Sequence, residues 1–286
     1  MHNLKQLIHS KKTVWAAGAF DALSARLIQE AGFDALLTSG YGISSSFLGE
    51  PDTEFYTMTE NLSVVRNICN AVTIPVVADI DTGYGNAVSA MRTLREFENA
   101  GASAVIVEDQ VSPKRCPCSS SAIDIVPMEE HVGKIRAMVA ARRNPDMLII
   151  ARTDAVDGAE AIRRGRAYVA AGADIIQPIS RCFKDFAGLQ AMREGCGVPL
   201  SLQLLAWLET DLDRKQIEQV AALATYPLVA LMSATQAMRT NLRALADAKS
   251  SRQLPLAVTG LHDFNDFIGF SRVDALQKQY MGGQQA

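Results

Sequence analysis

Three segments of the chain share one pattern, and this repeat is the feature that most constrains the fold. Each begins with Ala-Gly, passes through a short turn and continues as an apolar run, at residues 31–39, 100–108 and 171–179. Glycine readily adopts the left-handed conformation that ends a helix, and a continuous apolar run is typical of a strand buried on both faces of a parallel sheet. The repeat therefore predicts helix-to-strand joints of a recurring βα unit.

Apolar runs with the length of a buried strand recur along most of the chain. They lie near residues 14–19, 35–39, 75–80, 104–108, 147–152, 174–179, 198–204 and 227–232. The stretches between them have helical periodicity, and the last of these is expected at 213–224. Eight strands alternating with helices in a chain of 286 residues predict an α/β fold, the (β/α)8 TIM barrel. A doubly wound sheet is the alternative, but a glycine-rich dinucleotide motif does not follow the first strand.

A barrel of this size accounts for most of the chain, so we predict a single domain over residues 1–286, with 254–286 as a C-terminal helical tail. The tail carries apolar residues at helix-like spacing, namely Leu261, Phe264, Phe267, Ile268 and Phe270. A monomer that exposed these aromatic side chains would be prone to association. The tail is therefore expected to pack on the barrel or on a neighbouring subunit of a homo-oligomer.

Charge and cysteine content narrow the class of partner. The net charge is −3, and Lys and Arg are scattered among acids, which argues against nucleic acid as a partner. No apolar run approaches the roughly 18 residues that cross a membrane, and the N-terminus lacks a signal-peptide core. Five cysteines without framework spacing indicate free thiols in a reducing compartment. We therefore expect a cytoplasmic protein that acts on a small molecule.

An acidic pair follows the third apolar run. Asp79 and Asp81 are separated by one residue, where the run gives way to Thr82-Gly83-Tyr84-Gly85. In a strand, residues i and i+2 point the same way, so the two carboxylates are expected to converge. Like charges held this close require a cation or a shared proton, and Mg²⁺ is the oxygen-seeking ion that fits best. The structural alternative is a pair that caps the next helix or forms salt bridges.

Polar side chains stand at the ends of six predicted strands, on the side where the catalytic face of a TIM barrel lies. They are Thr38-Ser39-Gly40-Tyr41, Asp79 with Asp81, Glu108-Asp109-Gln110, Arg152-Thr153-Asp154, Gln177 with Ser180, and Gln203. Packing alone does not explain six neighbouring strands that end in polar groups. Taken singly, Glu108 or Arg152 is explained equally well by a buried structural ion pair. Taken together, the residues predict a functional site at this end of the barrel.

Two connections, 40–57 and 109–127, are longer than is usual between such elements, and long loops on the catalytic face are usually lids or substrate-binding elements. The second contains Lys114-Arg115-Cys116-Pro117-Cys118. A thiol beside two cations should have a lowered pKa and act as a proton donor or a nucleophile. A cationic loop with incidental cysteines is the alternative. A zinc clip is disfavoured, because no second Cys-His cluster has zinc-ligand spacing.

Four ordered motifs resemble the isocitrate lyase and phosphoenolpyruvate mutase superfamily, and its short-chain members close to 2-methylisocitrate lyase in particular. The motifs span residues 79–85, 108–110, 113–116 and 150–154, and the resemblance continues into the Phe264-Asn265-Asp266 region. It implies a Mg²⁺-dependent barrel, with Mn²⁺ as an alternative ion, whose eighth helix is exchanged between the subunits of a dimer, usually paired into a tetramer. It also implies chemistry on 2-oxo or 2-hydroxy acids through a metal-stabilised enolate.

The resemblance further implies roles for individual residues. The metal would be held directly or through water by Asp79, Asp81 and Glu108, with Asp52 near the same site. The substrate would be bound by Ser39, Gly40, Tyr41, Arg152 and Gln203. Cys116 would be the catalytic acid that reprotonates the enolate, supported by Lys114, and Arg152 would also serve catalysis by holding substrate oxygens.

The thiol favours a carbon–carbon lyase within this superfamily, because the mutases and the phosphonopyruvate hydrolases lack it. Such a lyase would cleave a 2-hydroxy di- or tricarboxylate of the 2-methylisocitrate or dimethylmalate type and release pyruvate or a related oxo acid. The chain departs from the lyases at Pro117, Cys118 and Ile179, in the groups that read the distal part of the substrate. The alternatives are an oxaloacetate decarboxylase or hydrolase, a phosphonate-acting mutase or hydrolase, and an inactive ligand-binding barrel.

Overall fold

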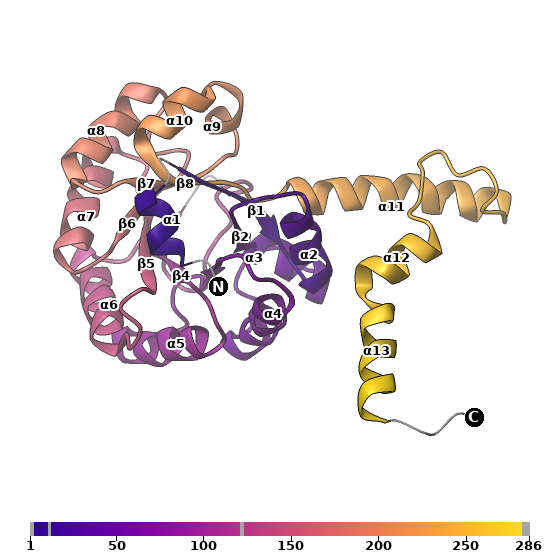
Figure 1. Ribbon diagram of the computed structural model, residues 1–286. Helices are drawn as coiled ribbons and strands as arrows, with labels where there is room; N and C mark the ends of the chain where they lie inside the picture. Colours follow the sequence, from indigo (N-terminus) through magenta and orange to yellow (C-terminus); the bar gives the residue numbers. More distant parts are fainter. Residues whose placement is uncertain (1–2, 11–12, 121–122, 282–286) are drawn as a thin grey trace. The chain divides into compact units, whose positions relative to one another are not determined.

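The strands form a closed barrel in which each pairs in parallel with the next and β8 pairs with β1 (Figure 1). The computed structural model describes residues 3–10, 13–120 and 123–281. The strands are β1 (Val14–Ala19), β2 (Ala35–Thr38), β3 (Val76–Asp79), β4 (Ala104–Glu108), β5 (Leu148–Thr153), β6 (Ile175–Pro178), β7 (Leu200–Gln203) and β8 (Ala221–Tyr226). The predicted TIM barrel is confirmed.

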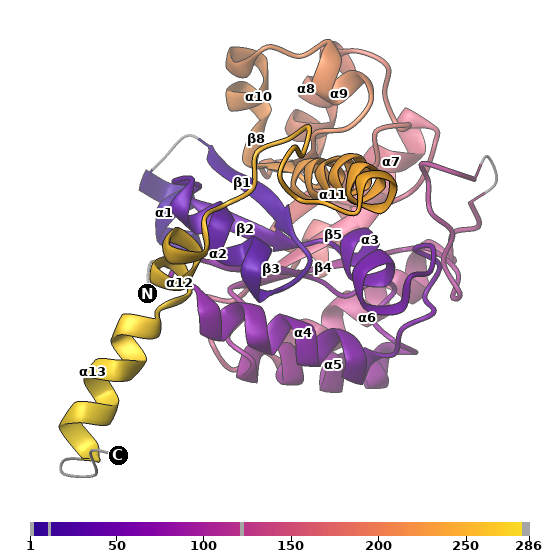
Figure 2. The same cartoon turned by 90° about the vertical axis from the view of Figure 1, so that its right-hand side faces the viewer.

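Helices alternate with the strands and surround them, and Figure 2 shows α4 and α5 side by side outside the sheet. The surrounding helices are α2 (Ala22–Glu30), α4 (Met58–Ala71), α5 (Ala87–Asn99), α6 (Met128–Ala141), α7 (Gly158–Ala170), α8 (Phe186–Cys196) and α10 (Arg214–Val220). Local chemistry sets where several of them begin. Thr57 and Glu60 form a capping box at α4, and the Asn86 side chain accepts from the first turn of α5.

Apolar side chains on both faces of the strands build the core. One face fills the barrel interior with residues such as Val14, Leu37 and Ile106, and the other packs against the helices. Leu4 of α1 (Leu4–Ser10) joins the interior cluster, so α1 covers the end of the barrel where the strands begin. This two-sided burial explains why the strands read as continuous apolar runs rather than as alternating patterns.

The prediction was wrong at the last βα unit. Residues 213–224 were expected to be a helix and 227–232 a strand, whereas α10 ends at Val220 and β8 occupies Ala221–Tyr226. The alanine-rich start of β8 favours a helix by intrinsic propensity, but its pairing with both β7 and β1 outweighs that preference. The apolar run that was assigned to the strand contributes instead to the start of α11 (Val229–Ala248).

The segment 40–57, expected to be a loop, is partly helical. It contains α3 (Gly40–Ile43) and the π-helix η1 (Ser44–Leu48), which ends at Gly49 in the left-handed conformation. π-Helical turns are uncommon and occur often at functional sites. The helical start of this segment fixes residues 39–41 directly after β2.

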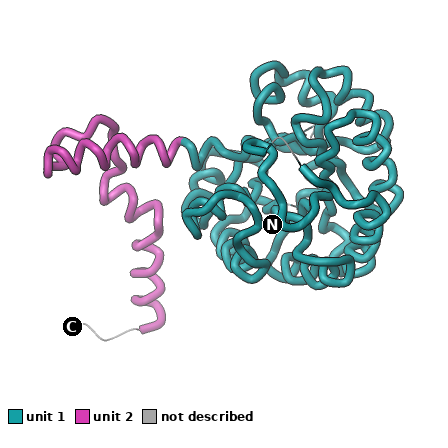
Figure 3. The backbone as a smooth tube through the Cα atoms, turned by 180° about the vertical axis from the view of Figure 1, so that it is seen from behind, with its two compact units in different colours: residues 1–232 teal, residues 233–286 magenta. Residues whose placement is uncertain are grey.

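The chain divides into two compact units, residues 1–232 and 233–286, coloured separately in Figure 3. The boundary lies within α11, earlier than the tail expected to start at 254. The second unit contains the rest of α11, α12 (Leu261–Ile268) and α13 (Phe270–Tyr280), and none of the residues in these three helices is buried. Within the described ranges, no helix combines the length and the apolar character needed to cross a membrane.

Candidate functional site

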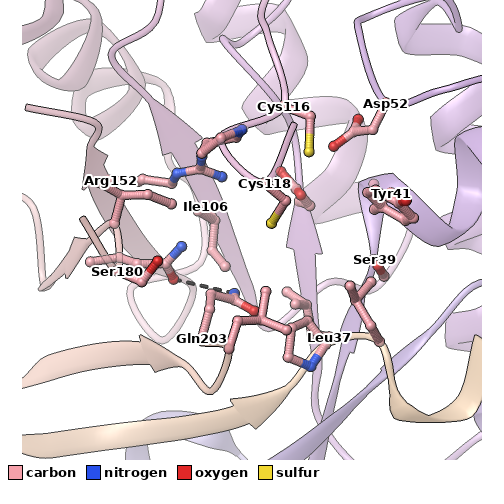
Figure 4. Close-up of a pocket in the computed structure, with 18 of the residues that line it drawn as sticks. Leu37, Ser39, Tyr41, Asp52, Ile106, Cys116, Cys118, Arg152, Ser180 and Gln203 are labelled. Atoms are coloured by element: carbon pink, nitrogen blue, oxygen red, sulfur yellow. Dashed lines mark hydrogen bonds between the residues drawn. The ribbon is translucent and has the colours of Figure 1, made fainter. Parts of the chain in front are cut away.

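A cavity of about 480 Å³ lies where the strands end, as predicted from the polar strand ends. Eight of the predicted site residues line it: Ser39, Gly40, Tyr41, Asp52, Asp79, Cys116, Arg152 and Gln203 (Figure 4). The other three, Asp81, Glu108 and Lys114, are buried and reach the lining residues through ion pairs. The structure therefore brings all eleven predicted residues together.

The Lys114 ammonium lies among the carboxylates that were predicted to hold a metal. Its Nζ is 2.5 Å from Asp81 Oδ1, 3.0 Å from Asp52 Oδ1 and 3.9 Å from Glu108 Oε1. Burial alone would lower the pKa of Lys114, but the carboxylates around it outweigh burial and raise that pKa well above its usual value. Lys114 is therefore a fixed buried cation, and its loop is tied to the carboxylate cluster.

Asp81 does not share a strand face with Asp79, contrary to the prediction. β3 ends at Asp79, and Asp81 follows in a turn with a φ of +49°, in the left-handed region. The carboxylates remain adjacent, because the Asp81 backbone N–H donates to Asp79 Oδ1 at 3.2 Å. The Tyr84 hydroxyl donates to Asp81 Oδ2 at 3.0 Å, so the glycine-rich turn also supplies a hydrogen-bond donor to the Asp81 carboxylate.

Arg152 links the ends of two neighbouring strands. It stands opposite Glu108 in the pairing of β4 with β5, and its Nη1 lies 2.7 Å from Glu108 Oε2. Its Nη2 donates to Asp154 Oδ1 at 2.8 Å. The guanidinium thus satisfies buried carboxylates and also lines the cavity, so the structural ion pair and the functional role are compatible.

Negative charge exceeds positive charge in this cluster. It holds five carboxyl groups, Asp52, Asp79, Asp81, Glu108 and Asp154, against the two cations Lys114 and Arg152. Burial raises the pKa of Asp79 to about 6, although Lys114 opposes the shift, and burial also raises the pKa of Glu108 well above its usual value. Burial thus disfavours the charged forms of Asp79 and Glu108, and a further cation would favour them.

The donor set fits a hard divalent cation. Asp52 Oδ1, Asp81 Oδ1 and both Glu108 carboxylate oxygens are buried, and among the described residues they face only the cationic groups of Lys114 and Arg152. Carboxylate oxygens are the ligands that Mg²⁺ prefers, and excess negative charge favours a divalent ion. In the described part of the chain, however, no group of three or more His, Cys, Asp and Glu side chains has the geometry to hold a metal ion. The ammonium of Lys114 lies between the carboxylates of Asp52 and Asp81.

The turn after β2 presents small polar groups to the cavity. Ser39 caps α3, and its Oγ accepts from the Gly42 N–H at 3.1 Å. A Cβ on Gly40 would lie 2.9 Å from Asp79 Oδ2 and 2.8 Å from the Tyr56 hydroxyl, so only glycine fits without a shift. The close approach leaves the backbone of residues 39–41 next to the carboxylate cluster.

Two thiols enter the cavity from the segment after β4 (Figure 4). A hydrogen bond from the Cys118 thiol lowers the pKa of Cys116 to about 6, and the Cys118 backbone N–H adds to the effect. Lys114 also lowers this pKa, by less than Cys118 does, and Arg115 is not among the causes. The lowered pKa was predicted, but its main cause is Cys118 rather than the flanking cations, because the Lys114 ammonium faces the carboxylates.

The far side of the cavity combines amides with apolar side chains. Gln203 Nε2 donates to Gln177 Oε1 at 3.5 Å, and the Ser201 hydroxyl donates to the same oxygen at 2.8 Å. Gln177, which was predicted only as one of the polar strand ends and was given no role, lines the cavity, and so does Arg181, which was not predicted. Gln177 stands opposite Arg152 on the adjacent strand.

The chain resembles characterised enzymes along nearly its whole length. The profile of the family described as phosphoenolpyruvate phosphomutase matches residues 4–251. The 2,3-dimethylmalate lyase of Eubacterium barkeri is 38% identical and covers 98% of each chain. The 2-methylisocitrate lyase of Shewanella oneidensis is 33% identical over 93% of this chain and 92% of its own. The structure of a phosphonopyruvate hydrolase complex with oxalate and Mg²⁺ superposes with a TM-score of 0.88 at 32% identity, covering 98% of each chain.

The thiol pair predicts a specific pH dependence of alkylation. Above its pKa Cys116 is a reactive thiolate and below it an inert thiol, so its iodoacetamide alkylation should reach half its maximal rate near pH 6. In Cys118→Ala the thiolate loses its main hydrogen-bond donor, and the midpoint should move up toward the ordinary value of 9.0. Mass spectrometry of the peptide that contains Cys116 measures both rates. An unchanged midpoint in Cys118→Ala would show that Cys118 does not stabilise the thiolate.

Proposed function

Because the chain belongs to the isocitrate lyase and phosphoenolpyruvate mutase superfamily, we propose that it is a Mg²⁺-dependent carbon–carbon lyase. Its substrate is a 2-hydroxydicarboxylate with alkyl branches, of the dimethylmalate type, and one product is pyruvate or a related 2-oxo acid. The observation that carries the proposal is the position of Cys116. Its thiol lines the same cavity as Asp79, Arg152 and the turn at residues 39–41.

The carboxylate cluster supports the metal requirement. Asp81, Asp79 and Glu108 would hold Mg²⁺, directly or through water, with Asp52 beside them. The ion would neutralise the negative charge that develops on the substrate oxygens during bond cleavage. Lys114 would contribute a second positive charge to the same region, because its ammonium contacts Asp52 and Asp81.

The remaining groups suit substrate binding and proton transfer. The backbone of residues 39–41 and Arg152 would hold the carboxylate and the oxygen of the 2-oxo acid portion. A carboxylate of the cluster would take up the 2-hydroxyl proton, and the oxygen would become the carbonyl of the 2-oxo acid as the adjacent carbon–carbon bond breaks. The electron pair of the broken bond remains on the carbon next to the second carboxylate. That carbon then takes up a proton at the Cys116 side. The pKa of Cys118 is raised, first by its hydrogen bond to Cys116, so at neutral pH the proton that the two sulfurs share lies on Cys118 and would reach the carbon through Cys116.

The cavity wall favours alkyl branches over a third carboxylate. Leu37, Ile106, Ile179 and Leu205 are among the residues that line it. The lining also includes two guanidinium groups, and Arg152 is already paired with Glu108 and Asp154. Arg181, the second guanidinium, donates to the Ser120 carbonyl oxygen. Methyl groups gain about 0.8 kcal/mol per buried carbon against such a wall, whereas an unpaired carboxylate loses its hydration.

We also propose that the enzyme is a homo-oligomer, with the C-terminal helices contacting a second copy. The exposed apolar side chains of α12 and α13 support this, since Leu261 and Phe270 are 77% and 58% exposed. Apolar side chains exposed along successive helices are typical of a protein interface. A second copy of the chain is the partner we propose, because most soluble oligomers are symmetric assemblies of identical chains.

Truncation tests the oligomer. Deleting the residues after Gly260 should yield a monomeric or unstable protein, because the apolar faces of α12 and α13 would be lost from the interface. Analytical ultracentrifugation measures the mass in solution, and circular dichroism reports whether the barrel remains folded. A truncated protein that sediments like the full-length oligomer would show that α12 and α13 do not form the interface.

Substitution of the thiol tests the lyase. Losing a positioned proton donor typically slows a chemical step 10²–10⁴-fold, so Cys116→Ala should lower kcat by about that factor with little change in substrate binding. Cys118→Ala should be milder. Cys69→Ala, which removes a thiol from α4, is the matched control and should keep its turnover. The assay follows pyruvate release from 2,3-dimethylmalate and 2-methylisocitrate with Mg²⁺ present.

The same assay separates the alternatives. A decarboxylase or a phosphonate-acting hydrolase would also release pyruvate, from oxaloacetate or phosphonopyruvate, but would not require a thiol at position 116. Near-normal turnover of Cys116→Ala on the best substrate would therefore reject the lyase in favour of one of those activities. If neither hydroxy acid is cleaved by the unchanged enzyme, the proposed substrate class is wrong.

A further inference from the structure

The Glu54 carboxylate joins the segments that follow three successive strands. Its Oε1 accepts from the Thr82 hydroxyl at 2.6 Å, just after the acidic turn that follows β3. Its Oε2 accepts from the Ser112 hydroxyl at 2.6 Å and from the Lys114 backbone N–H at 2.9 Å. Glu54 itself belongs to the segment after β2. A single side chain therefore holds together residues that lie far apart in the sequence.

The conformation of Glu54 is specialised for this role. Its φ of +58° lies in the left-handed region, which is uncommon for a residue with a Cβ. Such a conformation persists where surrounding contacts hold it in place, and it is found most often at functional sites. Here the contacts are the three hydrogen bonds that the carboxylate accepts. A carboxylate suits them because it is an acceptor only, with two oxygens.

The hydrogen bonds from Ser112 and Lys114 to Glu54 lie at the start of the stretch that carries the Lys114 ammonium and the Cys116 thiol. From Lys114 the chain places an ammonium among Asp52 and Asp81, and two residues later it places Cys116 in the cavity. The base of the segment is fixed separately, by backbone hydrogen bonds such as Val111 N–H to Asp124 O. Glu54 is thus a contact that sets where residues 112–116 lie beyond that base.

We propose that Glu54 is a positioning residue that holds residues 112–116 over the cavity and thereby places Lys114 and Cys116. The effect on turnover rests on the proposed lyase function, whereas the effect on the position of the segment does not. A hydrogen bond to an ionised group is among the stronger ones in proteins. Glu54→Gln keeps the size of the side chain but removes the charge, and its amide nitrogen cannot accept a hydrogen bond.

Limited proteolysis measures the position of the segment without any substrate. Arg115 is exposed, but trypsin can cut after it only when the neighbouring residues leave their folded position. In full-length Glu54→Gln the rate of cleavage after Arg115, followed by mass spectrometry, should rise about tenfold or more, since one charged hydrogen bond shifts an equilibrium by roughly that factor. Iodoacetamide alkylation of Cys116 should change in the same variant, while that of Cys69 should not.

Two further changes keep the test independent of folding. Ser112 is exposed, so Ser112→Ala should fold normally and raise cleavage by a smaller factor, and Ser112→Thr should restore the unchanged rate because it keeps the hydroxyl. Glu50→Gln is the matched control. Glu50 lies in the same segment after β2, is exposed, and its carboxylate forms no hydrogen bond or ion pair within the described ranges, so cleavage and turnover should not change.

Turnover provides the second readout. Glu54→Gln should lower kcat for pyruvate release in parallel with the increase in cleavage, because Cys116 and Lys114 spend less time in place. Unchanged cleavage after Arg115 in both Glu54→Gln and Ser112→Ala would overturn the proposal, as would an equal increase in Glu50→Gln. Increased cleavage in an enzyme that releases no pyruvate would support the positioning role and count only against the lyase.

Discussion

The buried contact between the Lys114 ammonium and the carboxylates of Asp52 and Asp81 is the interaction on which the functional end of this barrel depends. These residues come from the segments after β4, β2 and β3, which lie far apart in the sequence. Charges taken out of water are costly, and removing one partner of a buried pair typically destabilises a protein by about 3–5 kcal/mol. The cluster therefore fixes the geometry of the segments that carry it.

The same cluster explains the chemistry that the site supports. Lys114 and Arg152 compensate only part of the charge of five neighbouring carboxyl groups, and burial raises the pKa of Asp79 and Glu108. An enzyme that handles oxo acids needs a concentrated positive charge near the reacting oxygens, and in the proposed function a divalent ion bound by these carboxylates would supply it. In that proposal the apolar wall would select the rest of the substrate, and the two thiols would supply its proton.

Much of this arrangement was predictable from the sequence, because parallel strands bring their carboxyl ends to one face. The polar residues that follow β2 to β7 could be assigned to one site without knowing any distance. The last strand could not, since Ala221-Ala222-Leu223-Ala224 has the composition of a helix, and only pairing with both neighbours makes it a strand. Spacing also misplaced Asp81 on the strand, because its left-handed conformation depends on the turn that follows.

Contacts between distant segments were the hardest to predict. The sequence gives no sign that Glu54 reaches Ser112, or that the ammonium of Lys114 turns away from Cys116 toward the carboxylates. For that reason the lowered pKa of Cys116 was attributed to the flanking cations rather than to Cys118. Cys118, two residues away, is the donor, and a sequence pattern cannot distinguish a facing thiol from an incidental one.

The central claim is that the carboxylate cluster binds Mg²⁺, and calorimetric titration of the metal-stripped, full-length protein tests it most directly. The unchanged protein should show a single saturable Mg²⁺ site. Asp81→Asn, which keeps the shape of the side chain but removes its charge, should lose most of the affinity, and Asp146→Asn at an exposed position should not. Mg²⁺ affinity that is equal in Asp81→Asn and the unchanged protein would contradict this account.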